Sequence, residues 1–232
     1  MVSLHCQRLA MQRMLLQSSR VMPAPAAITL RRPLCNRAAV DRGRPTVLVP
    51  VADGSEEIEA VSIVDTLVRA GAAVTMASVE PRTLQVTCSR GVAIVADALI
   101  TDCVDRVFDA IVLPGGMPGA ERLRDDSTLT GLLRAQHSSG RLIGAVCASP
   151  AVVLAAHDLL GDRATCFPAP QLQQAWPLST TWVDERVVLS RNCRLITSQG
   201  PGTSLEFAIA IVEQLLGKDV ADAIAQQMLV TR

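Results

Sequence analysis

The sequence has 232 residues, 49% of them hydrophobic, and equal numbers of acidic and basic side chains. Seven widely spaced cysteines form neither a disulfide scaffold nor a CxxC metal motif, which indicates a reducing compartment and mostly free thiols. No apolar run reaches the ~18 residues of a membrane span. Beyond the N-terminal segment the net charge is negative, which argues against a nucleic-acid footprint. We therefore expect no membrane and no nucleic-acid partner.

The charges are distributed unevenly along the chain. Residues 1–40 contain six arginines and no Asp or Glu, so the rest of the chain holds 16 basic and 22 acidic groups, a net charge of −6. An Arg-rich, acid-free, serine-containing N-terminus is typical of organelle transit peptides. We interpret residues 1–44 as a transit peptide or a disordered basic extension, for the chloroplast or alternatively the mitochondrion. Residues 45–232 are expected to form one domain.

From residue 46 onward, apolar runs alternate with segments of helical periodicity. Residues 46–51 and 73–79 predict buried strands, and the segment between them predicts a helix that ends at Gly71. The apolar residues at helical spacing in that helix are Ile58, Val61, Val64 and Val68. This strand–helix–strand unit indicates a parallel sheet.

The alternation continues to the end of the chain. Residues 84–97 predict a small hairpin that turns at Arg90 and Gly91. The other expected elements are strands at 108–116 and 142–146, a hairpin at 186–198, and helices at 126–140, 149–160, 200–217 and 218–229. The whole pattern predicts a three-layer α/β/α sandwich with a mostly parallel sheet.

Cys147 lies between the strand predicted at 142–146 and the helix predicted from residue 149. Two connecting residues force a sharp turn, the arrangement of a nucleophile elbow at the carboxyl edge of the sheet. The dipole of the following helix would favour thiolate and lower the pKa of the Cys147 thiol. Free cysteines are also among the most buried residues, so spacing alone leaves a nucleophile and a packing residue equally open.

Two other segments carry groups that suit catalysis. Gly115 and Gly116 follow a predicted strand and permit backbone N–H groups to face a pocket, where they would cradle an oxyanion; a plain glycine turn is the alternative. Glu59 shares one side of the first helix with Ile63 and Thr66. Because Glu is seldom buried, we expect a surface position for Glu59, although burial would raise its pKa.

The chain resembles the ThiJ/PfpI family in four motifs that occur in the family's order, namely GSEEIEA, LPGGMPGA, AVCASP and SQGPGTSLEFAIAIVEQLLGK. The similarity is greatest to the branch of the parkinsonism-associated deglycase and its bacterial and plant relatives, and it covers nearly all of residues 45–229. The resemblance implies a flavodoxin-like fold related to class I glutamine amidotransferases, a homodimer, and no cofactor or metal.

The resemblance also implies roles for individual residues. Cys147 would be the reactive, oxidisable cysteine, and Glu59 the acid that forms a hydrogen bond with its sulfur. Gly115 and Gly116 would supply the oxyanion-binding amides, with help from the amide of Ala148. These expectations concern the three segments that the residue patterns already single out.

Further positions are implied around this site. Arg69 and Arg90 match arginines that lie near the site across the family's dimer interface, and Cys88 matches a secondary cysteine there. Phe167 stands where human-type members have a histidine, and the adjoining Cys166 is a candidate resolving cysteine. Met117 replaces a polar residue of human-type members, which implies a more apolar pocket.

The family's activities predict a cysteine-dependent, glutathione-independent glyoxalase or protein deglycase that acts on methylglyoxal, glyoxal or their early adducts with amines and thiols. The alternative is a non-catalytic redox sensor or redox-regulated chaperone that uses oxidation of the same cysteine. A cysteine peptidase or glutamine amidotransferase needs a histidine base beside the thiol. Neither His137 nor His157 has the right neighbours in the sequence for that role.

Overall fold

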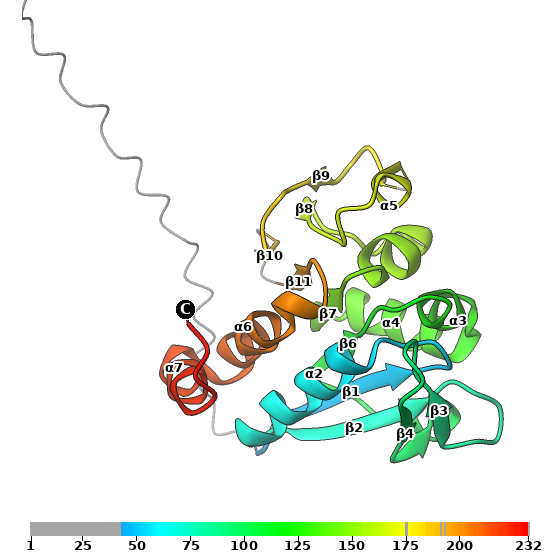
Figure 1. Cartoon of the computed structure of the whole chain (residues 1–232), viewed down its shortest axis with the longest axis horizontal. Helices are drawn as coiled ribbons and strands as arrows, with labels where there is room; N and C mark the ends of the chain where they lie inside the picture. The colour runs from blue at the N-terminus through cyan, green and yellow to red at the C-terminus, as the bar shows by residue number, and fades with distance from the viewer. Residues whose placement is uncertain (1–42, 175, 191, 193, 232) are drawn as a thin grey trace, which may run out of the picture. The chain divides into compact units, whose positions relative to one another are not determined.

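The computed structural model describes residues 43–174, 176–190, 192 and 194–231. The predicted N-terminal extension, residues 1–44, lies almost entirely outside the described residues. A seven-stranded sheet forms the centre of the described domain, with the strand order β10-β11-β7-β6-β1-β2-β5 (Figure 1).

All neighbouring strands of this sheet run parallel except β10, which pairs antiparallel with β11. The strands are β1 (Thr46–Val51), β2 (Ala73–Ser78), β5 (Ala98–Leu99), β6 (Ala110–Leu113), β7 (Leu142–Val146), β10 (Val187–Leu189) and β11 (Leu195–Ser198). The predicted, mostly parallel sheet is therefore confirmed, and the carboxyl ends of β1, β6 and β7 meet at one edge.

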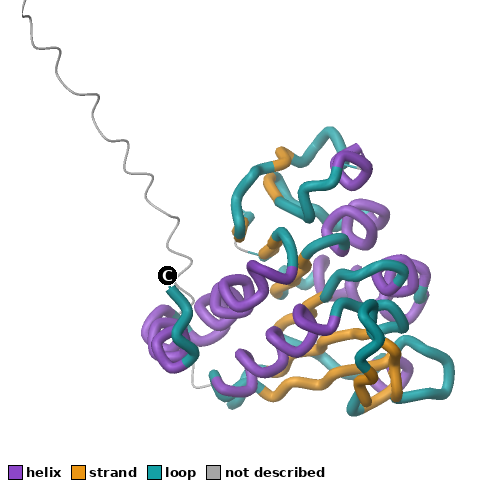
Figure 2. The backbone as a smooth tube through the Cα atoms, in the orientation of Figure 1, coloured by secondary structure: helices purple, strands orange, loops and turns teal. Residues whose placement is uncertain are grey.

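Helices cover both faces of the sheet (Figure 2). In β1, Val47 and Val49 pack into the core under α2 and α6, whereas Leu48 packs into the core under α3 and α4. Figure 1 shows α2 and α6 side by side, and α7 packs against α6. These helices are α2 (Glu57–Arg69), α3 (Gly119–Asp125), α4 (Ser127–Ser138), α6 (Ser204–Leu216) and α7 (Lys218–Gln227). The predicted three-layer sandwich is confirmed.

Two small additions extend from this framework. The predicted hairpin is present as β3 (Gln85–Thr87) and β4 (Ala93–Val95), which pair antiparallel. A longer excursion between residues 158 and 186 contains β8 (Arg163–Ala164), α5 (Pro170–Gln174) and β9 (Thr181–Trp182). Two short 3₁₀-helices, η1 (Ile100–Cys103) and η4 (Pro201–Thr203), complete the connections. The excursion is relevant to the site because it carries Cys166 and Phe167.

The face of α2 that packs against the sheet coincides with the stripe singled out in the sequence only at Val64, which is partly buried against the core. Ile63 and Leu67 are fully buried, whereas Ile58, Val61 and Val68 remain about half exposed. The helix therefore has apolar residues on both sides, and spacing alone does not tell which side meets the sheet. The stripe of Ile58, Val61 and Val68 forms an outward apolar face.

The helix predicted at 149–160 has a different geometry from the expected one. It consists of a π-helical turn, η2 (Pro150–Leu154), followed by a 3₁₀ turn, η3 (Ala155–His157), and it ends at Asp158 with φ +56°. The N–H of Ala155 donates to the carbonyl of Pro150, one residue further back than in an α-helix. Such wide turns are common at functional sites, and apolar periodicity does not distinguish them from α-helix.

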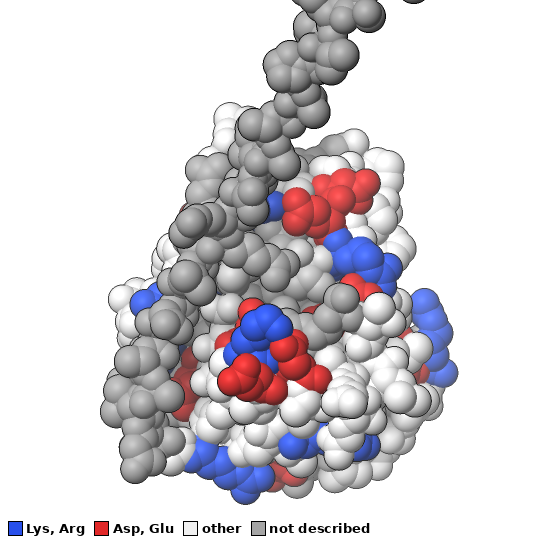
Figure 3. Space-filling model, turned by 90° about the vertical axis from the view of Figure 1, so that its left-hand side faces the viewer, with Lys and Arg blue, Asp and Glu red and all other residues white. Residues whose placement is uncertain are grey.

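Basic and acidic side chains lie together in mixed groups on the face seen in Figure 3. Examples of such pairing are the ion pairs Lys218–Asp222 and Arg186–Glu206. Among the residues described, none of the helices has the length and apolar character needed to cross a membrane.

Candidate active site

Cys147 follows β7 directly and adopts φ +62°, a conformation that is unusual for a residue other than glycine. Two backbone hydrogen bonds hold this strained turn. The N–H of Cys147 donates to the carbonyl of Ser198 (3.0 Å), and its carbonyl accepts from the N–H of Phe167 (2.8 Å). The side chain is half-buried. Strained backbone of this kind persists only where the surroundings fix it, and it concentrates at active sites.

Two backbone amides face the sulfur of Cys147. The N–H groups of Gly116 and Ala148 form hydrogen bonds with it, and both lower the pKa of the thiol. The amide of Gly115 has a different partner, since it donates to Oε2 of Glu59 at 2.6 Å. Of the three amides expected to bind an oxyanion, two are therefore directed at the reacting sulfur, and the third holds the carboxyl group.

The glycine pair is required by close packing. A Cβ atom on Gly115 would lie 2.6 Å from Cβ of Cys147 and 3.0 Å from Oε2 of Glu59, so no side chain fits there. Gly116 adopts φ +88°, which disfavours any residue with a Cβ atom. The carbonyl of Gly115 also accepts from the N–H of Glu56 (3.0 Å). The loop after β6 thus packs main chain against main chain on the start of α2.

Glu59 is fully buried, so the expected surface position is wrong. Its face of α2, which it shares with Ile63 and Thr66, is the side that the fold covers. Glu56 caps the helix, and its side chain accepts from the N–H of Glu59 at 2.7 Å. Oε1 of Glu59 is buried without an oxygen or nitrogen partner among the described residues. No pattern near Glu59 in the sequence indicates this burial, because the covering loop comes from residues 114–116, more than fifty residues further along the chain.

Burial raises the pKa of Glu59 to about 7, although hydrogen bonds from Gly115 and Cys147 act in the opposite direction. Charge on Glu56 raises this pKa further. The carboxyl group can therefore both donate and accept a proton near neutral pH.

The expected lowering of the Cys147 pKa is not found. Burial, and then the charge and hydrogen bond of Glu59, raise the pKa of the thiol to about 12 and outweigh the two amides. Between pKa values of about 7 and about 12 the two side chains together hold one proton. Transfer of that proton from sulfur to carboxyl leaves a thiolate beside a neutral acid that donates a hydrogen bond to it. The carboxyl group is thus the candidate base for this thiol.

The hairpin carries two further predicted residues to the start of α2. Glu57 accepts hydrogen bonds from Oγ of Ser89 (3.0 Å) and from the N–H of Arg90 (2.9 Å). The neighbouring Cys88 is buried, and burial together with the charge of Glu57 raises its pKa to about 11. Arg69 lies at the opposite end of α2, about 15 Å along the helix from its first turn. Within one chain the fold therefore brings Arg90, but not Arg69, toward the site.

Cys166 and Phe167 approach the site from the excursion. Cys166 is fully buried, its thiol donates to the carbonyl of Phe167 (3.4 Å), and burial raises its pKa to about 11. Phe167 is 44% exposed and is bonded through its N–H to Cys147. His157 instead contacts the carbonyl of Arg124 (2.9 Å), at the end of η3.

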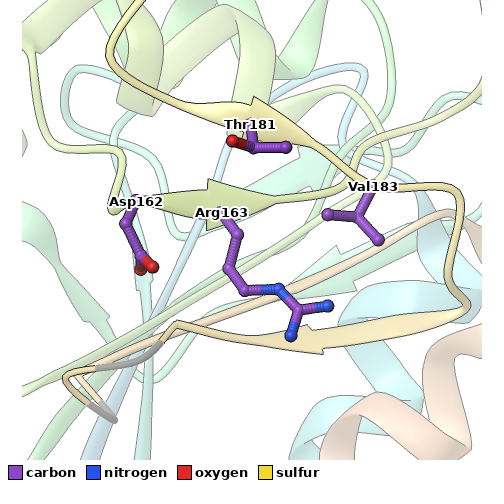
Figure 4. A pocket seen from close by; sticks show the side chains of 4 residues that line it. All are labelled: Asp162, Arg163, Thr181 and Val183. Carbon is purple, nitrogen blue, oxygen red and sulfur yellow. The ribbon is translucent and has the colours of Figure 1, made fainter.

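A surface pocket of about 170 Å³ lies on the excursion, separate from Cys147. Figure 4 shows its lining side chains on and beside β8 and β9, namely Asp162, Arg163, Thr181 and Val183. The guanidinium of Arg163 forms an ion pair with Glu185 (2.9 Å). Among the described residues, no group of three or more His, Cys, Asp or Glu side chains is arranged to bind a metal.

A parallel α/β sandwich with a cysteine at a strained turn and a buried glutamate beside it defines a class of cysteine-elbow proteins. Residues 45–214 match the DJ-1/PfpI family, and the chain belongs to this family. The resemblance inferred from four sequence motifs is confirmed.

Individual relatives agree with this assignment. The chain is 44% identical over 185 residues to Protein DJ-1 homolog A of Arabidopsis thaliana, an alignment that covers 79% of this chain but only 46% of that relative. It is 38% identical over 188 residues to Glutathione-independent glyoxalase DJR-1.2 of Caenorhabditis elegans, covering 80% and 96%. The solved structure of oxidized Toxoplasma gondii DJ-1 superposes with a TM-score of 0.76 at 48% identity, covering 81% of this chain and 100% of that one. The chain thus spans less than half the length of the Arabidopsis relative.

Proposed function

We propose that the protein is a cysteine-dependent, glutathione-independent glyoxalase or deglycase that acts on methylglyoxal, glyoxal or their early adducts. The observation that supports this most directly is the sulfur of Cys147 placed between the amides of Gly116 and Ala148 and the buried carboxyl of Glu59. The glyoxalase name of the Caenorhabditis elegans relative agrees with this chemistry.

The first step joins the sulfur to the aldehyde. Glu59 takes the thiol proton, and the Cys147 thiolate adds to the aldehyde carbon of methylglyoxal, which forms a C–S bond and places negative charge on the former carbonyl oxygen. The amides of Gly116 and Ala148, which bond the sulfur before the attack, are the donors expected to stabilise this charge. Glu59 then gives its proton to the oxygen, so the product is a neutral hemithioacetal.

The second step rearranges the adduct without an external oxidant. The Glu59 carboxylate removes the proton from the carbon that carries sulfur, and the electron pair moves to form an enediolate with its negative charge on the former ketone oxygen. The hydroxyl proton of the sulfur-bearing carbon passes to that oxygen, and Glu59 returns its proton to the neighbouring carbon. The neighbouring carbon is thereby reduced to an alcohol, while the sulfur-bearing carbon is oxidised to a thioester. Water cleaves the thioester and releases lactate and the free thiol. In an early adduct, the Cys147 thiolate replaces the amine or thiol bound to the aldehyde carbon: the new C–S bond forms as the old C–N or C–S bond breaks, and Glu59 gives the thiol proton to the departing group.

Lactate formation from methylglyoxal by the purified protein tests this proposal. Cys147→Ala is expected to abolish lactate formation, whereas Cys103→Ala, at a buried cysteine of η1, is expected to retain it. A second assay supplies the adducts together with an excess of an aldehyde scavenger. It distinguishes repair of the adduct from consumption of free aldehyde. Equal inactivity of the wild-type protein and Cys147→Ala would reject the enzymatic function.

The same groups support a second proposal, a redox sensor or redox-regulated chaperone. Oxidation of Cys147 to a sulfinate would place acceptor oxygens against the amides of Gly116 and Ala148 and against a protonated Glu59. Mass spectrometry after mild peroxide treatment, paired with an aggregation assay, tests this role. A sulfinate that forms at Cys147 and switches on protection of client proteins, in a protein without aldehyde turnover, favours the sensor over the enzyme.

We also propose that the protein is a homodimer formed through the outward apolar face of α2. Ile58, Val61 and Val68 are each about half exposed there, and Val92 and Val95 of the hairpin add further exposed apolar surface. Exposed apolar patches of this kind mark interaction surfaces. Val61→Glu is expected to shift the mass measured by light scattering from dimer to monomer. A wild-type monomer would reject the dimer.

A further inference from the structure

Two large apolar side chains remain exposed on the segments whose main chain contacts Cys147. Met117 is 48% exposed and follows Gly116, whose amide bonds the sulfur of Cys147. Phe167 is 44% exposed, and its N–H donates to the carbonyl of Cys147. The two side chains come from the loop after β6 and from the excursion, which are separate segments that both contact Cys147.

The ring of Phe167 is supported from one side by Gly200, at the start of η4. A Cβ atom on Gly200 would lie 3.3 Å from Cδ2 of the ring, a contact closer than ordinary van der Waals packing. The glycine therefore lets the ring rest against the main chain, while 44% of the residue remains accessible. Exposed aromatic surface that is held in place beside a nucleophile is surface that a bound molecule can cover.

We propose that Met117 and Phe167 form an apolar subsite that receives the substituent of the aldehyde and selects 2-oxoaldehydes with an uncharged aliphatic or aryl group. The inference rests on the proposed function only in assuming that the aldehyde carbon bonds to Cys147. A substituent one carbon away from that bond lies next to the segments that carry Met117 and Phe167. A charged substituent would lose its hydration against these side chains without gaining a partner from them.

The ratio of kcat/KM for phenylglyoxal to kcat/KM for glyoxal measures this selection. Even one methylene group in an apolar pocket changes the discrimination between two substrates, measured as kcat/KM, by about tenfold or more. Phe167→Ala and Met117→Ala are therefore each expected to lower the ratio about tenfold. Gly200→Ala, which pushes on the ring, is expected to lower it in the same direction. Leu178→Ala, at a fully exposed residue of the same excursion, is the matched control and keeps the wild-type ratio.

A second readout does not depend on turnover. It is the ratio of two alkylation rates of Cys147, that by N-phenylmaleimide divided by that by N-ethylmaleimide. In the wild-type protein we expect this ratio to be higher than the same ratio measured for free N-acetylcysteine. Phe167→Ala should bring it about tenfold closer to the free thiol. If the protein turns over no aldehyde but shows this selectivity, the proposed enzyme fails and the apolar subsite stands. If both aldehydes are turned over, and neither ratio changes in Phe167→Ala and Met117→Ala, the subsite is rejected and the enzyme stands.

Discussion

Cys147 and Cys166 lie on adjoining segments, connected by the hydrogen bond from the N–H of Phe167 to the carbonyl of Cys147. Burial raises the pKa of both thiols. Only Cys147 has two backbone amides and a buried carboxyl group at its sulfur, whereas the thiol of Cys166 donates to a carbonyl oxygen. The comparison predicts that a buried cysteine such as Cys166 is inert, and that a proton acceptor beside the sulfur makes the Cys147 thiol usable.

Alkylation of both thiols in the folded protein is the most direct test of this difference between Cys147 and Cys166. We expect iodoacetamide to modify Cys147 about a hundredfold faster than Cys166 at pH 8, because Cys166 has no adjoining base and no exposed surface. Mass spectrometry of the digested protein gives both rates. In denaturant the two rates should converge, which is the control. Modification of Cys166 first, or modification of Cys147 only after unfolding, would contradict the assignment.

A second test disturbs the packing between the loop after β6, Cys147 and Glu59. Gly115→Ala places a methyl group against Cys147 and Glu59, so we expect lactate formation to fall about tenfold to a hundredfold and the free energy of unfolding to fall by about 1–3 kcal/mol. Gly131→Ala, in α4, meets no atom within 4 Å and should instead stabilise the protein by about 0.5–1 kcal/mol. Chemical denaturation and the lactate assay measure both variants. Equal behaviour of the two would show that the close approach at Gly115 has no role.

The pH dependence of stability tests the protonation of Glu59. Its pKa is raised from 4.5 to about 7, so the native state binds more protons than the unfolded state between these values. The stabilisation is therefore complete below pH 4.5 and is lost as pH rises through 7. Between pH 5 and pH 7 the loss amounts to about 2 kcal/mol. Glu59→Gln should remove this part of the pH dependence, as measured by urea denaturation. An unchanged slope in the variant would mean that Glu59 does not hold the proton.

Much of the framework was predictable because buried parallel strands have continuous apolar sequences. β1 and β7 begin and end at the predicted residues, and the turn at Cys147 follows from the two residues between β7 and the next helical segment. The excursion between residues 158 and 186 was not predictable, since its strands and helix contain only two to five residues each. Segments this short show no periodicity.

The candidate site was predictable in its members but not in its electrostatics. Local sequence identified Cys147 and the glycine pair, yet the burial of Glu59 depends on a loop more than fifty residues away. The same long-range packing explains why Gly115 binds the carboxyl group and why the pKa of Cys147 rises. The buried face of α2 was not predictable for the same reason. The helix has apolar residues on two sides, and only its packing against the rest of the fold determines which side is buried.

The peptide groups around Gly115 have a consequence for how this protein can change over evolution. Its N–H holds Glu59, its carbonyl holds the N–H of Glu56, and the next amide faces the sulfur. The atoms of the candidate site are thus held mainly by main-chain groups, which a substitution of a neighbouring side chain leaves in place. If positions 117 and 167 form the proposed subsite, exchanging their side chains is expected to redirect the choice of substrate without altering the proposed chemistry.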